Sequence, residues 1–137
     1  MRPVLAHTVM VLSFISGDAI WLTLSGPYYR SVLKPLLGDT VVVAPAILFY
    51  VIYLFGVGVF CVVPALGRGW RTALWRGALF GFVAYATYDM TNYATLKGWT
   101  SQITAMDLAW GSFLTAAATS FAVLAGGGND QGVATRR

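Results

Sequence analysis

The chain has 137 residues, of which 58% are apolar and only 10% are charged, and its formal net charge is +4. About a quarter of the residues of a soluble domain are charged, so this composition excludes an ordinary soluble domain and indicates a membrane protein. Most of the few charges lie between long apolar blocks, and we interpret these as topology signals and not as a nucleic-acid surface. Cys61 is the only cysteine and His7 the only histidine, so we expect neither an internal disulfide nor a zinc or haem cofactor.

Four apolar runs are each long enough to supply the roughly 20 residues that span a bilayer. They cover residues 4–24, 41–63, 73–96 and 106–124. The first run is too long for the core of a signal peptide, and short connections make neighbouring helices antiparallel. The sequence therefore predicts an all-α, integral membrane, antiparallel four-helix bundle. It forms one domain of residues 1–125, and residues 126–137 are expected to be a disordered polar tail.

Local signals set the expected ends of two helices. Gly26-Pro27 is expected to end the first helix, because proline interrupts helical hydrogen bonding. Residues 28–37 would then form either a short interfacial helix or a plain surface loop. Thr104 and Asp107 have the spacing of a capping box, which places the start of the last helix near residue 106.

The basic residues predict an orientation in the membrane. Six of them lie on the side that holds both termini and the middle linker: Arg2, Arg68, Arg71, Arg76, Arg136 and Arg137. The opposite side holds three: Arg30, Lys34 and Lys97. Cytoplasmic segments carry the excess of lysine and arginine. We therefore expect a multi-pass protein of the inner (plasma) membrane with both termini in the cytoplasm.

Asp89 lies in the third apolar run, where an ionisable group costs roughly 2.5–3.5 kcal/mol by insertion scales. Helical spacing places Tyr85, Tyr88 and Asn92 on the same face as Asp89. Lipid would penalise this polar face, so it is expected to face protein or trapped water. Small residues such as Gly81 on the same helix predict close packing against a neighbour.

Two further runs carry a carboxyl group beside a tryptophan. Asp18 shares a helix face with Trp21 in the first run, and Asp107 lies near Trp110 at the start of the fourth. The expected topology places Asp18, Asp89 and Asp107 in the outer half of the bundle. The sequence alone does not fix whether Asp18 and Asp89 touch, because connectivity does not determine helix order.

Three functional hypotheses follow from these polar residues. The favoured one is a site that binds or moves a proton, a hard cation or a small solute, with Asp89 at its centre and Asp18 as its partner. In this hypothesis Tyr88 and Asn92 orient the ligand and Asp107 lies at the entrance of the site. Transport would require a homodimer.

The two alternatives use the same side chains differently. In a membrane enzyme acting on lipid, Asp89 or Asp18 would be the general acid or base, and Tyr88 or Tyr28 would donate a hydrogen bond to the substrate. In a purely structural or accessory subunit, Asp89 would only bond to Tyr28 or Tyr85 and hold helices together. The sequence contains no nucleophile triad, phosphate loop or Rossmann turn that would decide for an enzyme.

The residues also resemble a known family over about residues 12–114. The matching segments are Asp18–Leu22, the region of Tyr28, Pro45-Ala46, Phe49-Tyr50, Tyr53, Gly77–Gly81, Tyr85–Asn92, Ala94–Leu96, Trp99, Asp107 and Trp110-Gly111. In these segments the chain resembles the bacterial membrane proteins grouped as domain of unknown function 2177, and the Tyr-Asp-x-Thr-Asn block is the most specific match. The resemblance implies a small integral membrane protein of four spans and implies no activity.

Overall fold

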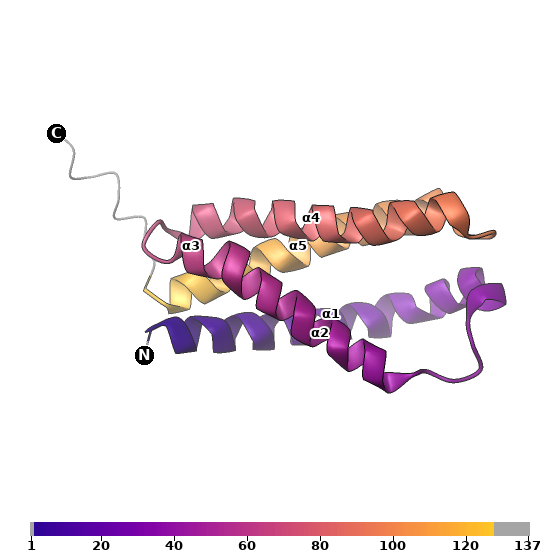
Figure 1. Ribbon diagram of the computed structural model, residues 1–137, viewed down its shortest axis with the longest axis horizontal. Coiled ribbons are helices and arrows are strands. Elements are labelled where there is room, and N and C mark those ends of the chain that lie inside the picture. The colour runs from indigo at the N-terminus through magenta and orange to yellow at the C-terminus, as the bar shows by residue number, and fades with distance from the viewer. Residues whose placement is uncertain (1, 128–137) are drawn as a thin grey trace.

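The computed structural model describes residues 2–127, and these residues form helices joined by short connections (Figure 1). The elements are α1 (Arg2–Leu33), a 3₁₀ turn (Lys34–Leu36), α2 (Val43–Val57), a π-helical turn (Gly58–Val62), α3 (Val63–Ala65), α4 (Trp70–Thr95) and α5 (Ser101–Ala125). The beginning of α1, the turn between α3 and α4, and the end of α5 lie at one end of the bundle. The described chain is thus an all-α antiparallel bundle, as expected. The prediction for the tail falls almost wholly on residues 128–137, which lie outside the described part.

Three helical segments are long and apolar enough to cross a membrane: Arg2–Leu36, Val43–Ala65 and Ser101–Ala125. The fourth helix, α4, has 26 residues but falls outside this group. Its second half carries tyrosines, Asp89 and Asn92, which lower its hydropathy. The fold is therefore a helical membrane bundle, and the membrane crossing of α4 stays a prediction.

The closest packing in the bundle joins α4 to α5 through small residues. A Cβ atom added at Gly81 would overlap the carbonyl oxygen of Gly111 and lie 2.8 Å from Thr115 Oγ1. Thr119 on α5 donates a hydrogen bond of 3.0 Å to the carbonyl of Ala73 on α4. The predicted close approach at Gly81 is confirmed, and the partner helix is α5.

The expected break of the first helix at Gly26-Pro27 is wrong, because α1 continues through Pro27 to Leu33. A proline inside a helix removes one backbone hydrogen bond, and membrane helices tolerate this loss where neighbouring helices support them. Here the turns after residue 24 pack against the bundle, since Ser25 and Leu33 are both buried. The residues expected to form a separate interfacial helix are thus mostly the last turns of α1.

The expected start of the fourth helix near residue 106 is also wrong. Helix α5 begins at Ser101, and the side chain of Thr100 accepts a hydrogen bond of 3.2 Å from the backbone N–H of Ile103. Asp107 therefore lies in the second turn of α5 and does not cap it. Its carboxyl group is left available for contacts with other helices.

Helix α2 packs against the bundle by its C-terminal half only. Residues 43–49 are all exposed, whereas Tyr53, Leu54 and Val57 are buried. In Figure 1, α2 runs at an angle to α1, α4 and α5. Its N-terminal half therefore diverges from the bundle and leaves room beside α1 for the cavity described below.

Candidate functional site

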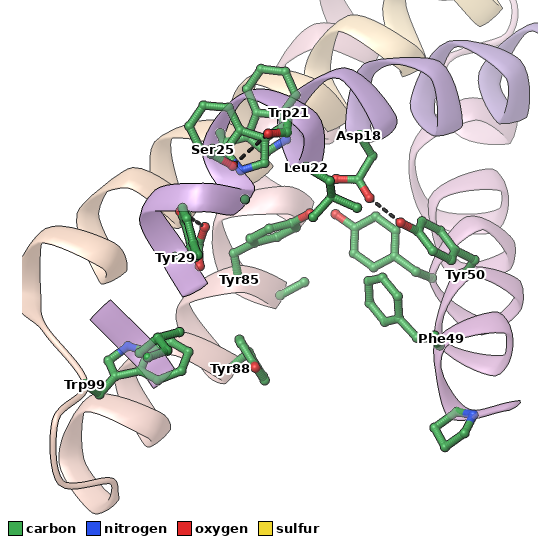
Figure 2. Close-up of a pocket in the computed structure, with 18 residues that line it drawn as sticks. Asp18, Trp21, Leu22, Ser25, Tyr29, Phe49, Tyr50, Tyr85, Tyr88 and Trp99 are labelled. Carbon is green, nitrogen blue, oxygen red and sulfur yellow. Dashed lines mark hydrogen bonds between the residues drawn. The ribbon is translucent and has the colours of Figure 1, made fainter. Parts of the chain in front are cut away.

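A cavity of about 810 Å³ lies between the C-terminal half of α1, the N-terminal part of α2, and the facing turns of α4 and α5 (Figure 2). Its wall consists of Asp18, Trp21, Leu22, Ser25, Gly26, Tyr29, Leu33, Pro45, Ala46, Phe49, Tyr50, Tyr53, Ala84, Tyr85, Tyr88, Trp99, Asp107 and Trp110. Half of these side chains are aromatic. The carboxyl side chains of the wall are Asp18 and Asp107, and among the described residues no lysine, arginine or histidine lines the cavity.

Asp18 is held in the wall by a hydrogen bond between helices. The hydroxyl of Tyr50 on α2 donates to Oδ2 of Asp18 on α1 (Figure 2). Asp18 is only 8% exposed, so its carboxyl group is largely shielded from the surroundings of the bundle. This bond is one of the contacts that tie the diverging part of α2 to α1, and it leaves the second oxygen of Asp18 for another partner.

Asp107 forms a second anchored carboxyl group in the same wall. The hydroxyl of Tyr29, near the end of α1, donates to Oδ1 of Asp107 on α5. This contact exists because α1 continues past Pro27 and brings Tyr29 level with the second turn of α5. Each lining carboxyl group therefore accepts a hydrogen bond from a tyrosine on another helix.

Asp89 lies behind this wall and not on it. Its side chain is 0% exposed, and within residues 2–127 neither of its oxygens receives a hydrogen bond from an N–H or O–H group. The group that faces it at hydrogen-bonding range is the carboxyl of Asp107. Two carboxyl groups can form such a hydrogen bond only when one of them carries a proton.

Stacked aromatic rings complete the wall at the α1–α5 contact. The rings of Trp21 and Trp110 are nearly parallel, with centroids 4.7 Å apart and an interplanar angle of 9°. Tyr29 meets Trp21 edge to face at 6.4 Å, and Tyr88 meets Trp99 in the same way at 5.8 Å. The indole N–H of Trp110 is buried without an acceptor in the described structure. The wall therefore presents aromatic faces and edges between its two carboxyl groups.

The structure gathers most of the site residues expected from sequence. Those on the cavity wall are Asp18, Trp21, Tyr85, Tyr88, Asp107 and Trp110. Tyr28 and Asn92 do not line it: Tyr28 packs edge to face on Tyr29, and Asn92 interacts with Tyr88. The expected partner of Asp89 also differs, since Asp89 faces Asp107 and Asp18 faces Tyr50.

Sequence reasoning missed Tyr29 and Tyr50, the two hydroxyl donors. Ser25 follows Asp18 by seven residues and Tyr29 follows it by eleven, so in a continuous helix all three lie on the same face. The predicted break at Pro27 hid this alignment. Tyr50 carries no comparable signal, because its contact with Asp18 depends on the angle of α2.

Within residues 2–127 no group of three or more histidine, cysteine, aspartate or glutamate side chains is arranged to hold a metal ion. We therefore propose no metal site for the hard cation considered from sequence.

These features define the class: a helical membrane protein with a partly polar, aromatic-walled cavity between its helices. The family described as "Predicted membrane protein (DUF2177)" matches residues 3–124, and the chain belongs to this family. The resemblance inferred from the Tyr-Asp-x-Thr-Asn block and the other segments is thereby confirmed. Neither the curated proteins nor the solved structures contain a match to the chain.

Proposed function

We propose that the cavity binds a small amphiphilic organic cation inside the membrane. The observation that carries this proposal is the charge of the wall. Asp18 and Asp107 are its ionisable acids, and no basic side chain of the described chain lines it to balance them. Buried charges in a low-dielectric site need a partner of opposite charge, and a cationic ligand would supply it.

The aromatic wall supports the same chemistry. Cations bind over aromatic faces with about 0.5–1 kcal/mol at exposed sites and about 2 kcal/mol or more when desolvated. Tyr88 and Trp99 offer such rings away from Asp18, and the Tyr85 ring lies between them and Asp18 (Figure 2). A volume of about 810 Å³ falls within the range of about 300–1,000 Å³ that small-molecule pockets occupy. An apolar body with one ammonium group would match both the rings and the carboxyl groups.

The place of the cavity indicates how such a ligand would arrive. The cavity lies beside the part of α2 whose residues 43–49 are exposed, in a helix apolar enough to cross the membrane. An amphiphile dissolved in the bilayer could therefore reach the cavity from the side, between α1 and α2. Transport across the membrane would additionally require alternating access, and we propose only binding here.

We further propose that all four helices cross the inner membrane and that the end of the bundle with the N-terminus faces the cytoplasm. Among the described residues, four arginines lie at the start of α1 or at the start of α4 and the turn before it: Arg2, Arg68, Arg71 and Arg76. Three basic residues lie at the opposite helix ends, near the end of α1 or after α4: Arg30, Lys34 and Lys97. This excess of basic residues supports the orientation. A reporter fused after Arg137 should show that this end of the chain is in the cytoplasm. An extracellular signal would overturn the proposed orientation.

Binding can be tested with a matched pair of probes. Phenyltrimethylammonium carries a quaternary nitrogen, and tert-butylbenzene has nearly the same shape with a neutral carbon in its place. We expect equilibrium dialysis of the protein in lipid nanodiscs to show saturable binding of the cation. After the uptake by empty nanodiscs is subtracted, the protein should not bind the neutral analogue with comparable affinity.

The matched variants are Asp18→Asn and Asp39→Asn. Asparagine can still accept the hydrogen bond from Tyr50, whereas Asp39 is exposed and does not line the cavity. Truncating one partner of a buried charge pair costs about 2–5 kcal/mol, so Asp18→Asn should weaken cation binding by at least about tenfold. Equal binding of both probes, or an unchanged Kd in Asp18→Asn, would overturn the proposal.

A further inference from the structure

The pairing of Asp89 with Asp107 assigns a second role to the site. Asp89 is fully buried, lies outside the cavity wall, and has no N–H or O–H donor in the described structure. Asp107 lies between Asp89 and the cavity, because it faces Asp89 and also lines the wall. Asp107 is therefore a direct connection between a ligand in the cavity and Asp89, and Tyr29 and Tyr88 also lie near Asp89 and line the cavity.

The groups around the pair indicate that it holds a proton. Tyr29 and Asp18 face it from α1, Tyr85 and Tyr88 face it from α4, and Asp107 is the contribution of α5. None of these groups is basic, so no positive charge in these contacts balances two carboxylates. Like charges at this range cannot both stay ionised in a buried site, and one shared proton turns their repulsion into a hydrogen bond.

We propose that Asp89 and Asp107 share one proton in the empty protein and release it when a cation occupies the cavity beside Asp107. The site would then exchange one proton for one cation. In the empty state the proton bridges the two carboxyl groups. In the occupied state both carboxyl groups are ionised, the cation balances the charge that appears, and the proton leaves to water. This inference rests on the proposed cation binding and adds the partner that competes with it.

The sign of the pH dependence follows from this exchange. Protons compete with the cation, so lowering the pH should weaken binding, by up to tenfold per pH unit for a one-to-one exchange. The variant Asp89→Asn separates proton exchange from cation binding. Its amide N–H₂ can donate to Asp107 as a protonated carboxyl would, but it cannot release a proton. Because Asp89 does not line the cavity, the ligand contacts stay in place.

The experiment is calorimetric titration of nanodisc-embedded protein with phenyltrimethylammonium in two buffers that differ in ionisation enthalpy. We expect about one proton released per cation in the natural protein. The variant Asp89→Asn should bind the cation with no proton release and with a Kd that does not change with pH. The control Asp39→Asn should match the natural protein. Cation binding without proton release, or unchanged release in Asp89→Asn, would overturn the exchange while leaving the proposed cation binding intact.

Failure of the natural protein to bind the cation would instead overturn both the proposed function and the exchange. The shared proton itself has a separate test that needs neither ligand nor variant. Infrared spectra of the protein with ¹³C-labelled aspartate carboxyl groups should contain a protonated-carboxyl band at neutral pH that shifts with the label. Its absence would show that the pair is not protonated and would overturn the inference whatever the binding result.

Discussion

Replacing Gly81 by alanine tests the close packing of α4 on α5, which positions Asp89 opposite Asp107. The added methyl group would overlap the carbonyl oxygen of Gly111 and approach its carbonyl carbon to 2.9 Å and Thr115 Oγ1 to 2.8 Å. Two of these three atoms belong to the backbone of α5 and cannot rotate away. Helix α4 would have to move outward along its whole contact with α5.

The size of the effect follows from two opposing terms. Overpacking a close contact costs about 1–3 kcal/mol. Replacing glycine by alanine inside a helix gains about 0.5–1 kcal/mol, because alanine loses less conformational freedom on folding. Gly56→Ala is the matched control, since Gly56 is also helical, does not precede a proline, and its added Cβ would meet only the Phe80 side chain, which can move. Because both variants share the gain, their difference approximates the cost of overpacking against the backbone.

The assay is reversible unfolding in mixed micelles, followed by tryptophan fluorescence as the fraction of denaturing detergent rises. We expect Gly81→Ala to be less stable than Gly56→Ala by about 1–3 kcal/mol. Equal stability of the two variants would mean that Gly81 does not face the backbone of α5, and the placement of Asp89 against Asp107 would lose its support.

Two further predictions concern the ends and the turn of the helices. Thr100→Ala removes the side-chain acceptor for the N–H of Ile103. It should destabilise the protein by about 0.5–2 kcal/mol in the same unfolding assay. A stability equal to that of the natural protein would argue against this cap. Arg76 donates a hydrogen bond of 3.0 Å through Nε to the carbonyl of Phe60. In an α-helix this carbonyl would accept from the N–H four residues later, but that residue is Pro64, which has no N–H. Arg76→Leu should therefore cost about 1–3 kcal/mol, and Pro64→Ala should reduce that cost by restoring a backbone donor; additive effects in the double-mutant cycle would refute this coupling.

Much of the architecture follows from local properties of the sequence. Long apolar runs predict membrane helices because the bilayer leaves backbone groups no partner outside the helix. A carboxyl group such as Asp89 in a run of this kind must face protein, and the structure buries it completely. Tyr85 and Tyr88 lie near Asp89 and lower the hydropathy of α4. The same two tyrosines line the cavity.

The partners of these groups were decided by tertiary structure. Local signals at Pro27 predicted a helix end, but packing of the following turns keeps α1 continuous and delivers Tyr29 to Asp107. The angle of α2 brings Tyr50 to Asp18, and the contact of α4 with α5 selects Asp107 as the neighbour of Asp89. Hydropathy and spacing fix which face of a helix is polar. Which polar faces meet depends on the order, depth and tilt of the helices, and these are set by side-chain packing between segments far apart in the chain.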